Sequence, residues 1–263
     1  MDGGLLSALA DLVLPRTCAG CGVPGPVLCP RCAVLLAAPR PATPRRFPWG
    51  FPSTAAAGAY DGSVRPAVNA FKEQGRSELA RPLGAALALA VAAVVSAVPR
   101  GRGPVLLVPV PSSAAALRTR GRDHVRELTV RAVAELRAAG LPAAEARLLR
   151  RRGRARDSAG LSAAARRANL SGTFQRCGPP HPGVLLVLVD DVVTSGATLT
   201  EAAAALSAGA RRGDPPVLGA VVAATPRRPP GAMPSGSPRD APRPFENVRH
   251  DPPGRLSGGP WRD

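Results

Sequence analysis

The sequence predicts an α/β protein with a mainly parallel sheet flanked by helices, preceded by a small cysteine module. Three observations carry this prediction: short apolar runs alternate with longer helical patterns, one run is apolar throughout, and four cysteines cluster early in the chain. Strands that alternate with helices are typical of parallel sheets, whose central strands are buried on both faces. With 263 residues, 45% of them hydrophobic, the chain can bury a substantial core in one or two domains.

The elements follow from the apolar runs and their boundaries. We expect strands over 54–60, 105–110, 146–149, 184–189 and 217–223. We expect helices over 5–14, 65–72, 79–98, 122–139 and 198–208. The apolar stretch 83–98 has sixteen residues, fewer than the roughly 20 that span a bilayer, so it predicts a buried helix.

The same pass divides the chain into four parts. Residues 1–36 hold a helix and the cysteine module, 37–52 form a linker rich in Pro and Arg, and 53–224 form the α/β domain. The last part, 225–263, consists mostly of Pro, Gly, Ser, Arg and Asp, so we expect it to be disordered. No export signal or membrane span is convincing, and we expect a cytoplasmic protein without a membrane partner.

The formal net charge of +17 is unevenly distributed. Residues 118–176 hold fifteen arginines against five acidic residues, whereas 177–224 hold two against four. A local positive excess favours an anionic partner such as phosphate, pyrophosphate or nucleic acid. A solvated arginine surface accounts for the excess equally well. Lys72 is the only lysine, and aromatic residues make up 3% of the chain.

Four of the five cysteines have the spacing of a metal site. They form two C-x2-C pairs with seven residues between them: Cys18, Cys21, Cys29 and Cys32. Two such pairs close a tetrahedral four-sulfur site for structural zinc, with no coordination position left for catalysis. A redox C-x2-C pair and an iron–sulfur cluster are the alternatives. The fifth cysteine, Cys177, is expected to be a lone thiol.

The segment 184–198, VLLVLVDDVVTSGAT, carries the predicted chemistry. A buried strand ends in two carboxylates, Asp190 and Asp191, and ligands of open α/β sheets bind at this strand end. The loop that follows presents backbone N–H groups and hydroxyls at a helix N-terminus, which favours a phosphate. Gly196 would let the phosphate approach without a Cβ in its way. A ribose 5-phosphate fits both features, and an acidic strand end without ligand is the alternative.

Motifs outside this segment extend the pattern to a known family. The segment resembles the 5-phosphoribosyl-1-pyrophosphate (PRPP) signature of type I phosphoribosyltransferases, and together with the cysteine module the chain is similar to the competence protein F (ComF) family. The likeness covers about residues 5–223. The other motifs that carry it are Tyr60-Asp-Gly, Phe71-Lys72-x-x-Gly75, Val108-Pro-Val-Pro111, Arg120-Gly121 and Leu161-Ser162-x-x-x-Arg166-Arg-x-Asn169-Leu.

The resemblance implies a type I phosphoribosyltransferase core, with PRPP and Mg²⁺ as ligands and a mobile hood at 150–169. It implies that Asp190 and Asp191 hold the ribose diol and serve as the catalytic pair. The residues implied for the 5-phosphate are Thr194, Ser195, Gly196, Ala197 and Thr198. Those implied for the pyrophosphate are Ser112, Arg118 and Arg120, with Lys72 as a further cation that could equally be solvated.

The implied reaction transfers phosphoribosyl to a base or amine and releases pyrophosphate. The alternative implied by the family is a non-catalytic accessory protein of DNA uptake that binds single-stranded DNA or a helicase. A third reading keeps PRPP as a regulatory ligand. The chain departs from the family where Arg-Gly-Phe-Asn-Gln is replaced by Arg120-Gly121-Arg122-Asp123-His124. His124 is expected to be a surface or capping residue, with a proton carrier as the alternative.

Overall fold

The computed structural model describes residues 16–44, 49–98, 103–152, 172–178, 181–211 and 213–226. Three expectations lie outside these residues: the helix over 5–14, nearly all of the disordered tail, and the hood beyond residue 152.

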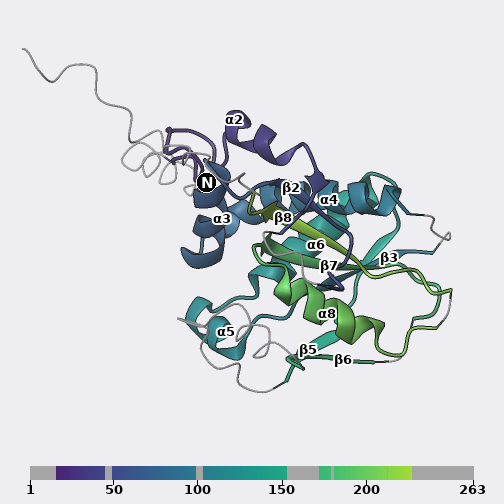
Figure 1. Ribbon diagram of the computed structural model, residues 1–263. Helices are drawn as coiled ribbons and strands as arrows, with labels where there is room; N and C mark the ends of the chain where they lie inside the picture. Colours follow the sequence, from purple (N-terminus) through teal and green to yellow (C-terminus); the bar gives the residue numbers. More distant parts are fainter. Residues whose placement is uncertain are drawn as a thin grey trace, which may run out of the picture. The chain divides into compact units, whose positions relative to one another are not determined.

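A six-stranded sheet forms the centre of the described chain (Figure 1). Its order is β1-β2-β8-β7-β3-β4, and every neighbouring pair is parallel except β1 with β2. The strands are β1 (Arg40–Pro41), β2 (Thr54–Ala59), β3 (Val105–Pro109), β4 (Ala143–Glu145), β7 (Leu186–Val193) and β8 (Leu218–Ala224). The α/β class with a mainly parallel sheet is therefore confirmed.

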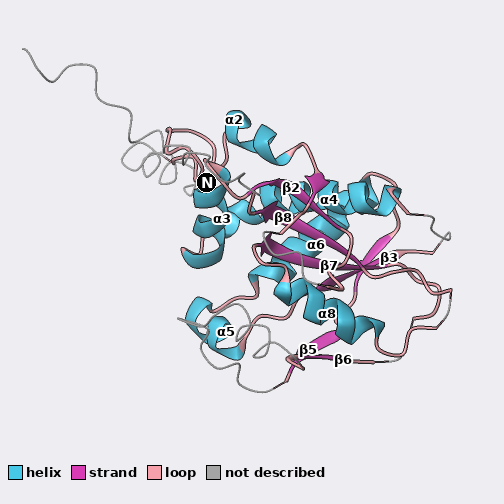
Figure 2. Cartoon of the chain, in the orientation of Figure 1, coloured by secondary structure: helices cyan, strands magenta, loops and turns pink. Residues whose placement is uncertain are grey.

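Helices and a small second sheet cover the two faces of this sheet (Figure 2). One core contains residues of α3 (Val64–Glu73), α4 (Ala80–Ser96) and α6 (His124–Ala138). The other contains residues of α8 (Ala197–Ser207) and of the antiparallel pair β5 (Leu149–Arg151) and β6 (Phe174–Arg176). The remaining helices are short: α2 (Pro30–Ala33), α5 (Ala114–Arg120), and the 3-10 turns η1 (Val34–Leu36) and η2 (Ser77–Leu79).

Alternation along β7 fixes which side chains meet which helices. Val187 and Val189 belong to the core under α4 and α6, whereas Leu186 and Leu188 belong to the core under α8. Successive strand residues point to opposite faces. The two carboxylates that follow in β7 therefore point to different layers of the protein, Asp191 toward α3 and α6 and Asp190 toward α8.

Helix α4 is the apolar helix expected over 79–98. Within the described chain one helical stretch, Ser77–Ser96, is long and apolar enough to cross a membrane by length and composition, and 61% of its most apolar window is buried in the fold. Gly84 lets α6 approach closely, because a Cβ there would lie 2.4 Å from the Cβ of Arg131. These contacts are those of a core helix.

Two expected segments differ from the structure. The strand predicted over 146–149 is wrong: the chain leaves the main sheet after Glu145, once the Ala146 N–H has bonded to the Leu107 carbonyl oxygen, and the next strand, β5, belongs to the small sheet. The segment expected to be a linker supplies edge strand β1, and the Ala42 N–H donates to the Thr54 carbonyl oxygen. A strand of two residues gives no apolar periodicity that a sequence could reveal.

The cysteine module rests directly on the sheet and on the turn between α3 and η2. Leu36 is buried in the core beside β2, and Gly58 leaves room for the Leu35 carbonyl oxygen, which would lie 2.5 Å from a Cβ. Arg76 donates to the Thr17 carbonyl oxygen at 3.1 Å. The module is therefore fixed to the core at two places.

Candidate functional site

The site predicted from the sequence lies where β7 ends and α8 begins. Thr194 and Ser195 are exposed in the connecting loop, and Gly196 adopts a left-handed conformation with φ of 79° at the start of α8. Among the described residues no side chain of the N-cap residue caps this helix, and the Ala197 N–H donates a long hydrogen bond of 3.5 Å to Ser195 Oγ. In the described chain the hydroxyls of Thr194 and Thr198 have no hydrogen-bond partner. The loop therefore offers unused donors at the positive end of a helix dipole.

Asp191 is the buried centre of a charged cluster. It is 3% exposed, and its Oδ2 accepts from Lys72 Nζ at 2.8 Å and lies 3.2 Å from His124 Nε2. Its Oδ1 accepts from the Val192 N–H at 2.7 Å. Burial raises the pKa of Asp191, but the His124 hydrogen bond and the Lys72 charge outweigh it and hold that pKa well below its usual range. Asp191 is therefore a fixed carboxylate.

Asp190 has the opposite character. Burial and the adjacent charge of Asp191 raise its pKa well above the usual range. Its Oδ1 accepts from the Asp191 N–H at 2.9 Å, no N–H group of the described residues donates to its Oδ2, and its carboxyl also interacts with the Asp191 side chain. Arg151 of β5 is the arginine whose own pKa responds to Asp190: burial lowers that pKa, and the Asp190 charge opposes the change. Two carboxylates with opposite shifts are typical of functional sites.

The cations implied for pyrophosphate are only partly brought together. Lys72, in the last turn of α3, is half-buried. Burial lowers its pKa, but the charges of Asp191 and Asp190 outweigh burial and raise that pKa above its usual value. Arg120 ends α5, forms a two-pronged pair with Glu73 at 2.8 and 3.0 Å, and is near enough to Lys72 to affect its charge. Arg118 is exposed, and Ser112 is half-buried just before α5; the structure gives neither a contact with the acidic pair.

His124 is not the surface residue that we expected from the sequence. Its side chain is 3% exposed and reaches Asp191, and its ring packs edge-on against Phe71 with 6.3 Å between centroids. The signal was present in the sequence: His124, Leu128, Ala132 and Leu136 recur every four residues and line the buried face of α6. The capping role belongs to Asp123, which accepts from the Arg126 N–H at 3.2 Å.

Gly196 has a different steric role from the one we predicted. A Cβ on Gly196 would lie 2.9 Å from two ring atoms of Phe51 and 2.9 Å from Pro44 Cγ. Both residues belong to the segment 42–44 and 49–53, which we call the strap. The open side of Gly196 is therefore filled by the strap, and the phosphate prediction depends on the N–H groups and hydroxyls of the loop.

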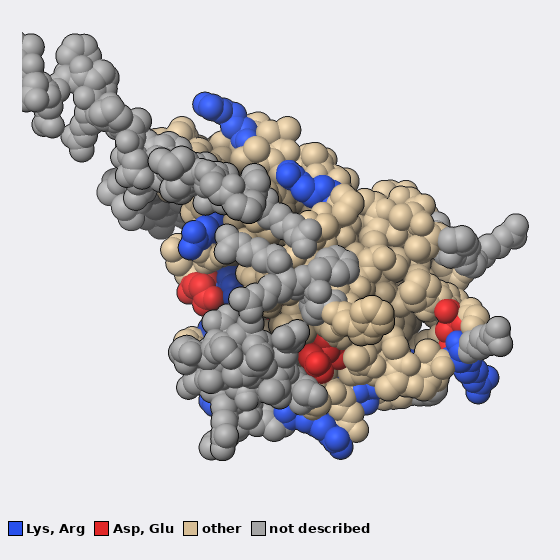
Figure 3. Space-filling model, viewed as in Figure 1, with Lys and Arg blue, Asp and Glu red and all other residues tan. Residues whose placement is uncertain are grey.

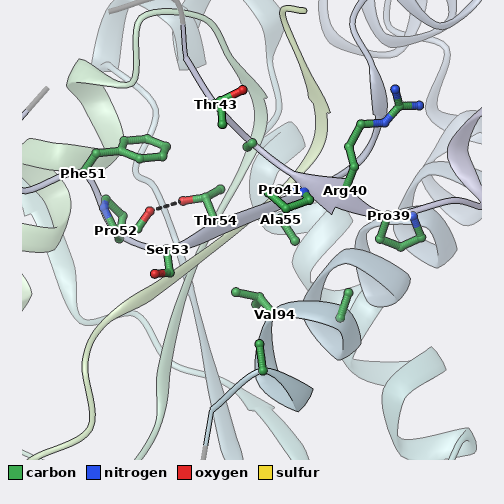
Figure 4. A pocket seen from close by; sticks show the side chains of 13 residues that line it. Pro39, Arg40, Pro41, Thr43, Phe51, Pro52, Ser53, Thr54, Ala55 and Val94 are labelled. Atoms are coloured by element: carbon green, nitrogen blue, oxygen red, sulfur yellow. Dashed lines mark hydrogen bonds between the residues drawn. The ribbon is translucent and has the colours of Figure 1, made fainter. Parts of the chain in front are cut away.

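A cavity beside β1 and α4 lies apart from these residues. Its volume is about 410 Å³, and none of its lining residues belongs to the predicted site. Strap residues and the start of β2 form one wall and the end of α4 the other, with Ala55 and Val94 on opposite sides (Figure 4). Inside it the Thr54 hydroxyl already donates to the Pro52 carbonyl oxygen at 2.7 Å. The cavity therefore offers mostly apolar surface.

The four cysteines come together as their spacing predicts. Their Sγ atoms all lie within 4.8 Å of one another, and Cys21 and Cys29 are 3.7 Å apart. Zinc–sulfur bonds of about 2.3 Å in a tetrahedron require sulfur atoms about 3.8 Å apart. Disulfide sulfurs would be about 2.05 Å apart, so this pair is not bonded. The cluster is compatible with a structural zinc ion.

The thiols of this cluster have different acidities. Burial raises the pKa of Cys18, but hydrogen bonds from the backbone N–H groups of Cys29, Cys21 and Gly20 outweigh it and lower that pKa to about 6. Burial, with the neighbouring thiols, raises the pKa of Cys32 to about 12. Cys177 is half-buried outside the cluster, as expected.

The fold and site thus define an α/β protein with an acidic strand end, an uncapped helix N-terminus and a four-cysteine cluster. No protein-family model matches the chain, and no curated protein matches it.

Proposed function

We propose that this chain is a PRPP-binding, phosphoribosyltransferase-like protein of the ComF kind. The observation that carries the proposal is the arrangement near the end of β7, where Asp190 is followed by the loop 194–196 and then by α8, which begins at Ala197. Hydroxyls of a ribose would donate to the Asp190 carboxylate, while a 5-phosphate would accept from the N–H groups of the loop. Lys72 and Arg120 supply positive charge on the side of Asp191.

The proposed reaction is a displacement at C1 of the ribose. The bond from C1 to the pyrophosphate oxygen breaks, a nitrogen of the acceptor forms the new bond to C1, and the acceptor loses one proton. Pyrophosphate leaves with the bonding electrons, and the Mg²⁺ that accompanies PRPP would screen its charge. The protein contributes positioning of the sugar and a positive environment for the leaving group.

Calorimetric titration with PRPP and Mg²⁺ tests the binding step. We expect saturable heat for the wild type and an affinity at least tenfold lower for Asp190→Asn, since the amide no longer accepts two hydroxyl protons. Glu135→Gln is the matched control, because Glu135 is an exposed acid on α6. Absence of heat at millimolar ligand would overturn the proposal. A screen of bases and amines for pyrophosphate release then asks whether turnover occurs.

A second candidate function, binding of single-stranded DNA, is favoured by Trp49. Its side chain is 98% exposed on the strap, and the next residue, Gly50, lies against Thr200 of α8. Exposed aromatic rings are the surfaces on which single strands stack their bases. The basic side chains support this candidate less: on the face in Figure 3, the coloured Lys and Arg side chains lie at separate places, and acidic side chains lie between them.

A gel-shift series separates this candidate from charge attraction alone. If Trp49 stacks on bases, Trp49→Ala weakens binding of an oligothymidine several-fold at constant salt. If only arginine charge acts, the variant binds as the wild type does, and affinity falls steeply with salt for both.

A further inference from the structure

We propose that His124 is a positioning residue: it holds the Asp191 carboxylate beside Lys72, so that Asp190 is the carboxylate of the pair that meets the ligand. The inference deepens the proposed function and rests on it for the identity of the ligand. It assigns different tasks to two adjacent aspartates that the sequence alone treats as equivalent.

The acceptor positions of Asp191 are largely occupied. Its Oδ1 takes the Val192 N–H, and its Oδ2 is shared by Lys72 and His124. The side chain is also 5% exposed, which leaves little surface for a ribose hydroxyl. An ionised carboxylate offers about four lone-pair sites, and three are used here. Asp191 therefore acts within the protein.

His124 is held where it can do this. It begins α6, whose first turn is capped by Asp123, and its buried ring packs edge-on against Phe71. Its Nε2 faces Asp191 Oδ2, whereas its buried Nδ1 has no partner among the described residues. Because a carboxylate only accepts, Nε2 must carry the proton in this hydrogen bond. Arg122 holds Phe71 in turn: its guanidinium lies 4.3 Å from the centre of the Phe71 ring and donates a hydrogen bond to the Phe71 carbonyl oxygen.

Asp190 has the complementary arrangement. It follows Leu188 on the face of β7 that carries α8, the helix that begins at the phosphate loop. It is half-buried, and its Oδ2 has no donor in the described chain. A ligand anchored by its phosphate at the loop would therefore find an unused acceptor in Asp190. Lys72 and His124 hold the Asp191 carboxylate in its present orientation, so that it does not rotate toward the same ligand.

Two substitutions separate positioning from mere packing. His124→Gln keeps an N–H donor at similar reach, whereas His124→Leu fills similar volume without one. By calorimetry with PRPP and Mg²⁺, we expect His124→Leu to lower affinity at least tenfold and His124→Gln to stay within about threefold of the wild type. In an Asp191→Asn background, His124→Leu should cause little further loss, because the pair acts as a unit.

The outcomes distinguish this inference from the function on which it rests. If the wild type gives no heat with PRPP, the proposed function fails. If the wild type binds and His124→Leu binds equally well, the positioning role is wrong and the proposed function stands. Equal losses in the Leu and Gln variants would indicate packing and would also overturn it. Nitrogen-15 spectra of the wild-type histidines test the contact without any variant of His124: a protonated Nε2 signal that shifts in Asp191→Asn supports it, and an unshifted signal contradicts it.

Discussion

Replacing Gly196 by alanine tests whether the strap packs on the loop between β7 and α8. The residue has a φ of 79°, which costs an L-amino acid about 1 kcal/mol. The new Cβ would also lie 2.9 Å from the Phe51 ring and from Pro44 Cγ, so the strap must shift. Overpacking of this kind costs about 1–3 kcal/mol. We expect the free energy of unfolding to fall by about 2–4 kcal/mol in total.

Gly50→Ala is the matched control for backbone strain. Gly50 also has a φ of 79°, but the nearest atom to its added Cβ is Thr200 Cγ2 at 3.8 Å, an ordinary contact. This variant should therefore lose only about 1 kcal/mol. The difference between the two variants isolates the contact between strap and loop.

Urea unfolding measures both variants. We expect the midpoint of Gly196→Ala to fall further than that of Gly50→Ala, with an unchanged m-value, because the surface exposed on unfolding is the same. If the chain binds PRPP as proposed, its affinity should also fall in Gly196→Ala, because the N–H groups of the shifted loop would no longer point at one phosphate. Equal midpoints for the two variants would refute the reasoning, because the strap would then not rest on Gly196.

Three further predictions concern the charges and the metal. Asp190→Asn should raise the free energy of unfolding by about 1 kcal/mol at pH 7.5. The pKa of Asp190 is raised, so its carboxyl stabilises the fold below its unfolded pKa of about 3.9 and loses that contribution as the pH rises through the folded pKa. Between pH 4 and pH 8, the free energy of unfolding of Asp190→Asn should therefore exceed that of the wild type by an amount that grows with pH. A difference that stays constant with pH would contradict this. Lys72→Met should cost about 2 kcal/mol, less than a fully buried pair because Lys72 is 29% exposed, and much less in an Asp191→Asn background; an equal loss in both backgrounds would exclude the ion pair as its cause. Elemental analysis should find about one zinc per chain in the wild type and Cys177→Ser but little in Cys32→Ser, and a chelator should lower the melting temperature of the two zinc-containing proteins; zinc retained by Cys32→Ser would argue against the four-sulfur site.

The parts that the sequence predicted well are those set by local patterns. The apolar run before Asp190 predicts a buried central strand, and all seven residues of β8 are buried beside it. The C-x2-C spacing predicts the cysteine cluster because each pair closes its own turn. Such features depend on interactions between residues that are close in the sequence, so they can be predicted from the sequence alone.

The parts that it missed depend on contacts between distant segments. Asp191 and His124 are 67 residues apart, and only the parallel order of β3 and β7 brings the start of α6 to the end of β7. The packing of the strap could not be predicted for a similar reason: Phe51 and Pro44 are far from Gly196 in the sequence and contact it only in the folded chain. The four-residue apolar periodicity of α6 could predict that His124 is buried, but it could not identify Asp191 as its hydrogen-bond partner.

Helix α3 shows how the two motifs of the sequence become one structure. At its start, the Ser63 carbonyl oxygen would lie 2.8 Å from a Cβ on Gly20, inside the first cysteine pair. At its end, Lys72 contacts Asp191 and Glu73 contacts Arg120. Ten residues span about 15 Å, so one rigid helix connects the cysteine cluster to the acidic site. Because α3 contacts both sites, a displacement of the cysteine cluster would also move Lys72 relative to Asp191.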